Sequence, residues 1–218
     1  MSPQKKAAAV TAAVANQVFA DEYLPASPAA EAARTLAAHH AADPVSPAAA
    51  ATLTFLAATV RARHVVEVGT GTGVSAVALL EGMADDGVLT SIDNEAELQL
   101  VAREVLNDAG VPRPRARLIA GEALGVLPKL TDGAYDLVFV DGDPLEYVEY
   151  VAQATRLLRP GGVLVLHHAL WQGLVADADN SDDEPLIVRE ALVAVRESEE
   201  FTAALLPVGD GLLVAAKV

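Results

Sequence analysis

Four titratable side chains of this chain stand at the ends of two apolar runs, in positions well suited to chemistry. Asp141 and Asp143 follow one Val-rich run, and His167 and His168 stand at the end of the next. Two carboxylates one residue apart can supply oxygen ligands to a hard cation such as Mg²⁺. Imidazole titrates near neutral pH, so either His can act as a general base. Cys is absent, which excludes thiol nucleophiles, disulfides and Cys-based metal sites.

The adjacent residues His167 and His168 leave three hypotheses open. Either imidazole can act as a general base without a metal. Together with Asp141, the two imidazoles can form a two-His, one-carboxylate set for Zn²⁺, Fe, Ni or Cu. In the third hypothesis one His packs in the interior, the other faces solvent, and neither has a chemical role. Adjacent residues of an extended strand face opposite sides, so the two rings converge only if the strand has already ended.

A glycine-rich turn separates the first Val-rich run after residue 64 from a helical segment. Its glycines Gly69, Gly71 and Gly73 fall at every second position. Glycine lets the backbone approach a ligand closely, and the start of the following helix offers free amides to an anionic group. A dinucleotide fingerprint needs glycine at position 74, where this chain has Val74. The spacing therefore disfavours a nicotinamide-dependent reductase.

Two carboxylates accompany the glycine turn. Asp93 ends the next apolar run, where it can accept hydrogen bonds from ribose hydroxyls or cap the helix that begins near residue 95. The backbone of Asn94 is available beside it. Glu67 lies two positions before the first glycine, in a run built to be buried. A buried charge is costly unless it is paired, so we expect a cationic ligand group such as an ammonium beside Glu67.

Alternating strands and helices are expected to position these residues. Proline breaks divide the first part of the chain into helices near 7–22, 28–42 and 46–61. Short Val-, Ile- and Leu-rich runs predict strands at 65–68, 88–92, 116–120, 136–140 and 163–167. The segments between these runs predict helices at 74–84, 95–109, 122–130 and 145–158. This order predicts a doubly wound α/β fold with a mostly parallel sheet.

The C-terminal part departs from this alternation. A helix expected at 184–199 is followed by two apolar runs at 201–206 and 211–217, and the turn between these runs predicts an antiparallel hairpin. The acidic stretch 177–184 is interpreted as a solvated, mobile loop.

Composition limits the partners of the chain. Its 218 residues predict one domain with an appendage, and 30 acidic against 15 basic residues give a net charge of -15. This charge argues against nucleic acids and anionic membranes, because both bind basic clusters. No apolar run approaches the ~18 residues of a membrane span. The Ala-rich stretch after Lys5 and Lys6 favours a helix over a secretory signal, so we expect a cytoplasmic protein with a small-molecule partner.

Six short motifs, taken in order, carry a family resemblance. They are EVGTGTG at 67–73, Ile92-Asp93, Gly121-Glu122-Ala123, YDLVFVD at 135–141, LLRPGG at 157–162 and LPVGDG at 206–211. From about Val45 to the C-terminus the chain resembles the S-adenosylmethionine (SAM)-dependent O-methyltransferases of the catechol/caffeoyl-CoA type, which are class I methyltransferases. The resemblance implies a Rossmann-like, seven-stranded sheet in which one strand of the hairpin runs antiparallel. It also implies a SAM-binding methyltransferase domain at 62–218 and an N-terminal helical cap at 1–61 that covers the acceptor pocket and helps to form a homodimer.

The same resemblance implies which residues hold SAM. Val45 and Ser75 would contact the methionine moiety, Glu67 its amino group, and Asp93 the ribose. Listed along the chain, the implied cofactor-binding residues are Val45, Glu67, Gly69, Thr70, Gly71, Gly73, Ser75, Asp93, Asn94, Gly121, Glu122, Ala123 and Asp143.

The chain departs from the family pattern at two places beside the acceptor. The family has a Lys that assists deprotonation where this chain has Pro144, and a metal-binding Asp-Asn pair where it has His167 and His168. Asp141 would be the metal and substrate residue, so the expected catalytic set, and the uncertain metal set, is Asp141, His167 and His168. We expect methyl transfer to the hydroxyl of a small aromatic or vicinal-diol acceptor. The alternatives are a metal-independent methyltransferase with a His base, and a protein that binds SAM or S-adenosylhomocysteine but has lost transfer.

Overall fold

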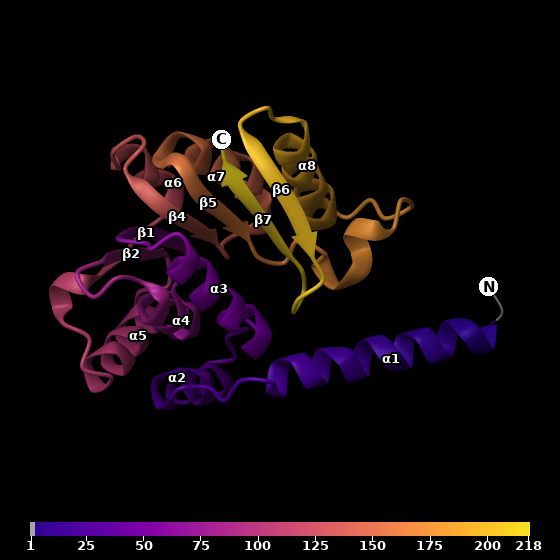
Figure 1. Ribbon diagram of the computed structural model, residues 1–218, viewed down its shortest axis with the longest axis horizontal. Helices are drawn as coiled ribbons and strands as arrows, with labels where there is room; N and C mark the ends of the chain where they lie inside the picture. The colour runs from indigo at the N-terminus through magenta and orange to yellow at the C-terminus, as the bar shows by residue number, and fades with distance from the viewer. Residues whose placement is uncertain (1–2) are drawn as a thin grey trace.

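A seven-stranded sheet forms the centre of the protein (Figure 1). The computed structural model describes residues 3–218, with side chains from residue 11 onward. The strands are β1 (His64–Val68), β2 (Val88–Asp93), β3 (Ala116–Ala120), β4 (Tyr135–Val140), β5 (Leu158–Leu166), β6 (Phe201–Leu206) and β7 (Leu212–Lys217). Their order in the sheet is β3-β2-β1-β4-β5-β7-β6. Successive strands are thus added on one side of β1 up to β3 and on its other side from β4 onward. In α/β folds such a switch point between two neighbouring strands opens a crevice for ligands.

The first five strands run parallel, and β7 pairs antiparallel with both β5 and β6. The doubly wound, mostly parallel fold with a C-terminal antiparallel hairpin is thus confirmed. Successive strand residues point to opposite faces, so Val65 of β1 packs in one apolar cluster and Val66 in the other. Both faces of the sheet are buried, which explains the near-continuous apolar runs of the parallel strands.

Helices cover both faces of the sheet. One face carries α2 (Pro28–His39), α3 (Pro47–Thr59), α4 (Val74–Gly82) and α5 (Ala96–Asp108). The other carries α6 (Ala123–Val126), α7 (Tyr147–Leu157) and α8 (Asp183–Glu197). Ser27 and Ser46 cap α2 and α3, each with a Pro at the first helical position. The sheet with its two helical layers is visible in Figure 1.

Several predicted boundaries were wrong, each for a local reason. The helix expected at 122–130 is the four-residue α6 followed by a 3₁₀ turn (Leu127–Lys129), because Pro128 cannot continue an α-helix. The helix expected at 145–158 begins as a 3₁₀ turn (Pro144–Glu146) before α7. The acidic stretch 177–184 is a loop only in part, since α8 begins at Asp183.

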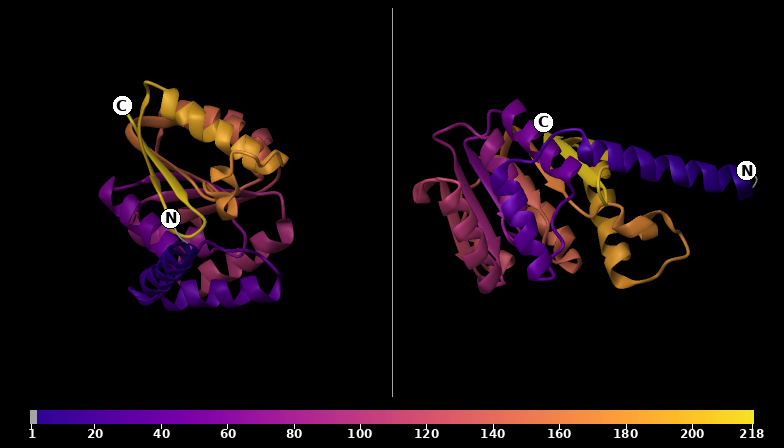
Figure 2. Two further views of the ribbon diagram at one scale, coloured as in Figure 1. Left: turned by 90° about the vertical axis from the view of Figure 1, so that its right-hand side faces the viewer. Right: turned by 90° about the horizontal axis from the view of Figure 1, so that it is seen from below.

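The first helix, α1 (Pro3–Glu22), projects away from the rest of the protein (Figures 1 and 2). Its inner end is fastened where Asp21 accepts a hydrogen bond from the backbone of Ala48 at 2.9 Å. Val18 and Phe19 on the helix are exposed, as is Tyr23 just after it. Within residues 3–218, no helix is both long and apolar enough to cross a bilayer.

Candidate functional site

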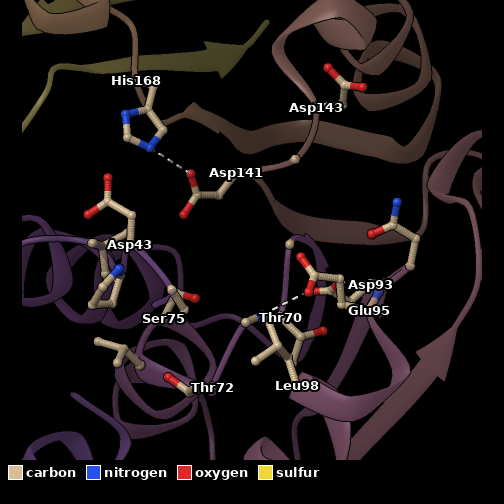
Figure 3. Close-up of a pocket in the computed structure, with 18 of the residues that line it drawn as sticks. Asp43, Thr70, Thr72, Ser75, Asp93, Glu95, Leu98, Asp141, Asp143 and His168 are labelled. Carbon is tan, nitrogen blue, oxygen red and sulfur yellow. Dashed lines mark hydrogen bonds and ion pairs between the residues drawn. The ribbon is translucent and has the colours of Figure 1, made fainter. Parts of the chain in front are cut away.

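A cleft of about 480 Å³ opens at the carboxyl ends of β1, β2 and β4, where the topology reverses. The loop before α3 forms its opposite wall through Asp43 and Val45. Figure 3 shows side chains from these segments facing a common space. Ten residues expected at the site from the sequence line the cleft: Val45, Gly69, Thr70, Gly71, Ser75, Asp93, Asn94, Asp141, Asp143 and His168.

The glycine turn between β1 and α4 brings the backbone to the floor of the cleft. Gly69 has φ +92°, and a Cβ there would lie 2.1 Å from the carbonyl oxygen of Asp141. Only glycine fits this close approach between the two loops. Gly73 has φ +93° and does not line the cleft; its Cα faces Ala102 of α5 instead. Gly69 thus lets the turn lie close to Asp141 at the floor of the cleft, whereas Gly73 lets the turn pack against α5.

Asp93 at the end of β2 fixes the glycine turn. Its Oδ2 accepts a hydrogen bond from the amide of Gly71 at 2.8 Å, and its Oδ1 accepts one from the amide of Glu95 at 2.8 Å. The prediction that Asp93 is the N-cap of the following helix is wrong, because Glu95 occupies the N-cap position of α5 (Ala96–Asp108) and Asp93 instead holds the turn before it. A carboxylate oxygen has two lone pairs, so each oxygen can still accept a second hydrogen bond from the cleft side.

Glu67 lies behind the cleft and is fully buried. Its Oε2 accepts a hydrogen bond from Ser91 at 2.5 Å, whereas Oε1 has no hydrogen-bond partner among the described residues. The pKa of Glu67 is raised to about 8: burial raises it most, hydrogen bonds with the hydroxyls of Ser75 and Ser91 lower it, and the charges of Asp141 and Asp93 raise it. An unpartnered buried carboxylate oxygen is costly, and a cationic group reaching it would satisfy it.

A smaller hollow of about 70 Å³ continues the cleft past Asp93. Its lining contains the expected adenine-side residues Gly121, Glu122 and Ala123, and also Asp143. The amide of Gly121 donates to the carbonyl of Asp93 at 2.9 Å, which holds the two loops together. We call this hollow, the glycine turn and Asp93 the cofactor end of the site.

At the other end of the cleft the three residues Asp141, His167 and His168 converge. One potential ligand atom from each lies within 4.8 Å of the other two. His167 Nδ1 is 2.7 Å from Asp141 Oδ1, and His168 Nε2 is 3.6 Å from the same oxygen. Figure 3 shows His168 directed at Asp141, with Asp43 beside them. We call these three residues together with Trp171 the acceptor end.

Backbone geometry explains why two adjacent imidazoles can face one carboxylate. The strand predicted through His167 in fact ends at Leu166, and His168 has φ +51°. The turn replaces the alternation of an extended strand, so the two ring centroids lie only 4.0 Å apart. His167 is thus packed and hydrogen-bonded, as the third hypothesis has it, whereas His168 lines the cleft beside it, and the chemical role of the pair stays a prediction.

The two imidazoles differ in their surroundings. The side chain of His167 is 4% exposed and lies behind the cleft, whereas that of His168 is 22% exposed and lines it. Burial lowers the pKa of His167, but its hydrogen bond with Asp141 and the charges of Asp141, Asp210 and Asp43 outweigh this and leave the pKa raised. The edge of Trp171 faces His168, with centroids 5.6 Å apart. His168 and Asp141 are thus the titratable groups that an acceptor would meet.

The donor set at the acceptor end does not fit the Mg²⁺ site of the resembled family. Mg²⁺ prefers oxygen ligands in octahedral geometry, and two of the three converging groups are imidazoles. Asp143 does not complete an oxygen-rich set, because its carboxylate points away from Asp141 and caps the following turn through Leu145 at 2.9 Å (Figure 3). Asp141 and Asp143, which the sequence suggested as joint Mg²⁺ ligands, therefore do not face a single ion position.

One residue at the acceptor end escaped the sequence reasoning. Asp210, in the turn between β6 and β7, has its Oδ2 2.9 Å from Nδ1 of His168. It is separated from His168 by 42 positions, and the motif LPVGDG marked the turn without assigning it a role. Only the pairing of β7 with β5 brings the two residues together.

Comparisons with known proteins agree over most of the chain. A model of the O-methyltransferase family matches residues 27–218. A relative from Mycobacterium sp. (strain JLS), whose name places it among the O-methyltransferases, is 50% identical over 85% of this chain and 84% of the relative.

Solved structures extend this similarity to the fold. A protein from Corynebacterium glutamicum is 31% identical with a TM-score of 0.88, over 95% of this chain and 97% of its own. The O-methyltransferase TomG from Streptomyces achromogenes, involved in tomaymycin synthesis and crystallised in complex with SAM, is 27% identical with a TM-score of 0.85. That match covers 94% of this chain and 96% of TomG. The resemblance deduced from the six sequence motifs is confirmed.

Proposed function

The chain belongs to the O-methyltransferase family, and from that premise we propose that it transfers the methyl group of SAM to a hydroxyl of a small aromatic or vicinal-diol acceptor. The observation that carries the proposal is the cleft itself. One end offers backbone amides and carboxylates for a nucleoside, and the other offers a His–Asp pair for a hydroxyl. SAM supplies a methyl group already activated on a sulfonium, so catalysis requires alignment and a deprotonated oxygen.

We assign the cofactor end to SAM, whose charged and polar groups match the residues there. Asp93 would accept hydrogen bonds from the ribose hydroxyls, and Gly121, Glu122 and Ala123 would lie beside the adenine. The unpartnered Oε1 of Glu67 would receive the ammonium of the methionine moiety. With a pKa of about 8, Glu67 is largely protonated near neutral pH while the site is empty, and the ammonium would favour its ionised form.

At the acceptor end we assign the role of general base to His168. Its Nε2 lies 3.6 Å from Asp141, beyond hydrogen-bond distance, so an acceptor hydroxyl entering the cleft can reach both groups. With SAM bound, Nε2 of His168 would accept the proton of the acceptor hydroxyl while the oxygen takes the methyl group, and the S–CH₃ bond would break to leave S-adenosylhomocysteine. The resulting imidazolium lies between the carboxylates of Asp141 and Asp210, which stabilise its positive charge. His167 holds Asp141 through the 2.7 Å hydrogen bond.

The charge of the cleft favours neutral or cationic acceptors. Its titratable lining residues are Asp43, Asp93, Glu95, Asp141, Asp143 and His168, and no Lys or Arg lines it in the described part of the chain. A carboxylate or phosphate on the acceptor would meet uncompensated negative charge. A hydroxylated ring that carries an amine, or no charged group, would not be repelled.

A charge-matched panel tests the function. Methyl transfer from SAM is measured with 4-methylcatechol, 3,4-dihydroxybenzylamine and 3,4-dihydroxybenzoate, with and without exhaustive chelation. We expect kcat/KM to be highest for the amine or the neutral catechol and lowest for the carboxylate, and to be unchanged by chelator. Transfer that requires added Zn²⁺ or Fe²⁺ would instead support the two-His, one-carboxylate metal site.

Calorimetric titration with SAM and with NADH separates the remaining alternatives. Binding of SAM without turnover of any catechol would favour a protein that binds the cofactor but has lost transfer. Binding of NADH with no response to SAM would contradict the proposal outright.

We also propose that residues 1–61 form a cap on the methyltransferase domain at 62–218, and that α1 packs against a second copy of the chain. Asp43 and Val45 of the cap line the cleft, so the cap helps to shape the acceptor end. The exposed side chains of Val18 and Phe19 would be buried by a partner. Light scattering after size exclusion should give twice the mass of the chain, and removal of α1 should halve it.

A further inference from the structure

The turn between β6 and β7 reaches into the acceptor end and fastens the segment that follows β5. The carboxylate of Asp210 makes two contacts there: Oδ2 with Nδ1 of His168 at 2.9 Å, and Oδ1 with the amide of Gln172 at 2.6 Å. The backbone carbonyl of Asp210 also accepts a hydrogen bond from the amide of Leu170 at 2.9 Å. One residue of the hairpin therefore holds both a side chain and the main chain of this segment.

The segment held by Asp210 has an unusual backbone. His168, Trp171 and Gln172 all have positive φ, between 43° and 53°, although none is glycine. Left-handed conformations are disfavoured for residues other than glycine, because Cβ then approaches the following carbonyl oxygen. They persist where surrounding contacts impose them, and such residues cluster at functional sites. The contacts of Asp210 close this turn around His168 together with two backbone hydrogen bonds, from the amide of Trp171 to the carbonyl of His168 and from the amide of Ala169 to the carbonyl of Gly211.

We propose that Asp210 is a positioning residue for His168: it fixes the neutral imidazole with its proton on Nδ1, so that Nε2 faces the cleft as a free proton acceptor. The catalytic consequence rests on the proposed function, whereas the orientation and the tautomer do not.

The chemistry of the pair dictates this tautomer. An ionised carboxylate only accepts hydrogen bonds, so the 2.9 Å contact requires a proton on Nδ1 of His168. A neutral imidazole has only one N–H, which leaves Nε2 as an acceptor. The 3.6 Å separation from Asp141 allows that lone pair to face the cleft without a direct partner there. In hydrolases with a Ser-His-Asp triad, an Asp behind the base His has the same effect on its tautomer.

The first measurement is made on the wild-type protein and needs no substrate. Two-bond ¹H–¹⁵N spectra of ¹⁵N-labelled protein at about pH 8.5 distinguish the two neutral tautomers of each His, and the His168→Gln variant assigns the signal. We expect the Nδ1–H form for His168. The Nε2–H form in the wild type would overturn the proposal.

The Asp210→Asn variant then tests the role of the carboxylate. Its amide oxygen can keep the bond to the Gln172 amide while its NH₂ donates to Nδ1, which forces the proton onto Nε2. We expect the tautomer to switch, kcat with 4-methylcatechol to fall by about 10²–10⁴-fold, and the KM and the Kd for SAM to stay within about twofold. The Asp86→Asn variant, which alters an exposed ion pair with Arg63, is the matched control and should change none of these.

The two readouts separate the two claims. An unchanged tautomer in Asp210→Asn would overturn the positioning role, whatever the activity does. A switched tautomer with full activity would support the positioning role while contradicting the assignment of His168 as the base. Rescue of kcat by Asp210→Glu, with the Nδ1–H form restored, would support both.

Discussion

The two ends of the cleft use left-handed backbone in opposite ways. At the cofactor end the residues with positive φ are all glycines, namely Gly69, Gly71, Gly73 and Gly121, whereas at the acceptor end they include His168 and Trp171. Glycine at the first end costs little conformational strain and brings main-chain atoms to the ligand. At the second end we assign the chemistry to the side chains themselves, and the strained backbone aims them. On this assignment, binding by backbone and catalysis by side chains place different demands on the same kind of turn.

The largest effect is expected for Gly69→Ala at the cofactor end. A Cβ would lie 2.1 Å from the Asp141 carbonyl oxygen at a φ of +92°, so the glycine turn must move away from β4. We expect SAM binding to become undetectable by calorimetry and the melting temperature to fall. Gly71→Ala is the control: with φ +51° and no heavy atom within 4 Å of its Cβ, it should bind SAM with a modest loss. Equal affinity in both variants would refute this account.

His168→Gln tests the acceptor end. The substitution removes a proton acceptor but no cofactor contact, so we expect kcat to fall by about 10²–10⁴-fold while the Kd for SAM is retained. Single-turnover rates with excess enzyme and calorimetry measure the two quantities. His39→Gln, at the end of α2, is the control and should behave like the wild type. A parallel loss of SAM affinity would show that the two ends are not separable.

Glu67→Gln sharpens the comparison through pH. The pKa of Glu67 is about 8 in the folded state and 4.5 in the unfolded chain, so between these values the folded state binds more protons. The stability of the cofactor-free protein therefore falls as the pH rises from about 5 to 8. Gln does not ionise, so we expect the free energy of unfolding of the variant to fall less over this pH range and SAM binding to weaken.

Thermal unfolding without cofactor at pH 5.5 and pH 8.5 makes the measurement for Glu67→Gln. The exposed Glu97→Gln on α5 serves as the control and should keep the wild-type pH profile. Identical profiles for the wild type and Glu67→Gln would count against the buried, cofactor-paired carboxylate.

The smallest effect is expected for Gln172→Gly. This variant places glycine at a left-handed position next to the acceptor end, as the cofactor end already has. Gln172 is exposed with φ +53°, so glycine relieves strain but adds chain entropy to the unfolded state. We expect the free energy of unfolding to rise by at most about 1 kcal/mol in urea titrations, with Gln172→Ala unchanged or lower. A loss of stability would mean that the turn is not strained.

Local patterns predicted most of the fold and the cofactor end. The glycine spacing before Val74 and the carboxylate of Asp93 each lie within one strand–turn–helix unit, so their geometry follows from neighbouring residues. Alternating apolar runs placed the parallel strands to within about two residues, except β5, which begins earlier at Leu158.

The acceptor end could not be read in the same way. The convergence of the two imidazoles depends on where β5 ends and on the φ of His168, which the residue types alone do not determine. Asp210 meets His168 only through the pairing of β5 with β7, across 42 positions of sequence. Local sequence patterns do not predict which distant strands pair, so they could not predict the contact between Asp210 and His168.

The hairpin has a consequence for the order in which the protein is made. The ribosome synthesises the chain from the N-terminus onward, and a domain folds as a unit once its elements are available. The residues of the cofactor end are all synthesised before His167, whereas Asp210 follows every other residue of the acceptor end. In a nascent chain all the residues that we assign to SAM are therefore present before the synthesis of Asp210, the residue that we propose to position His168.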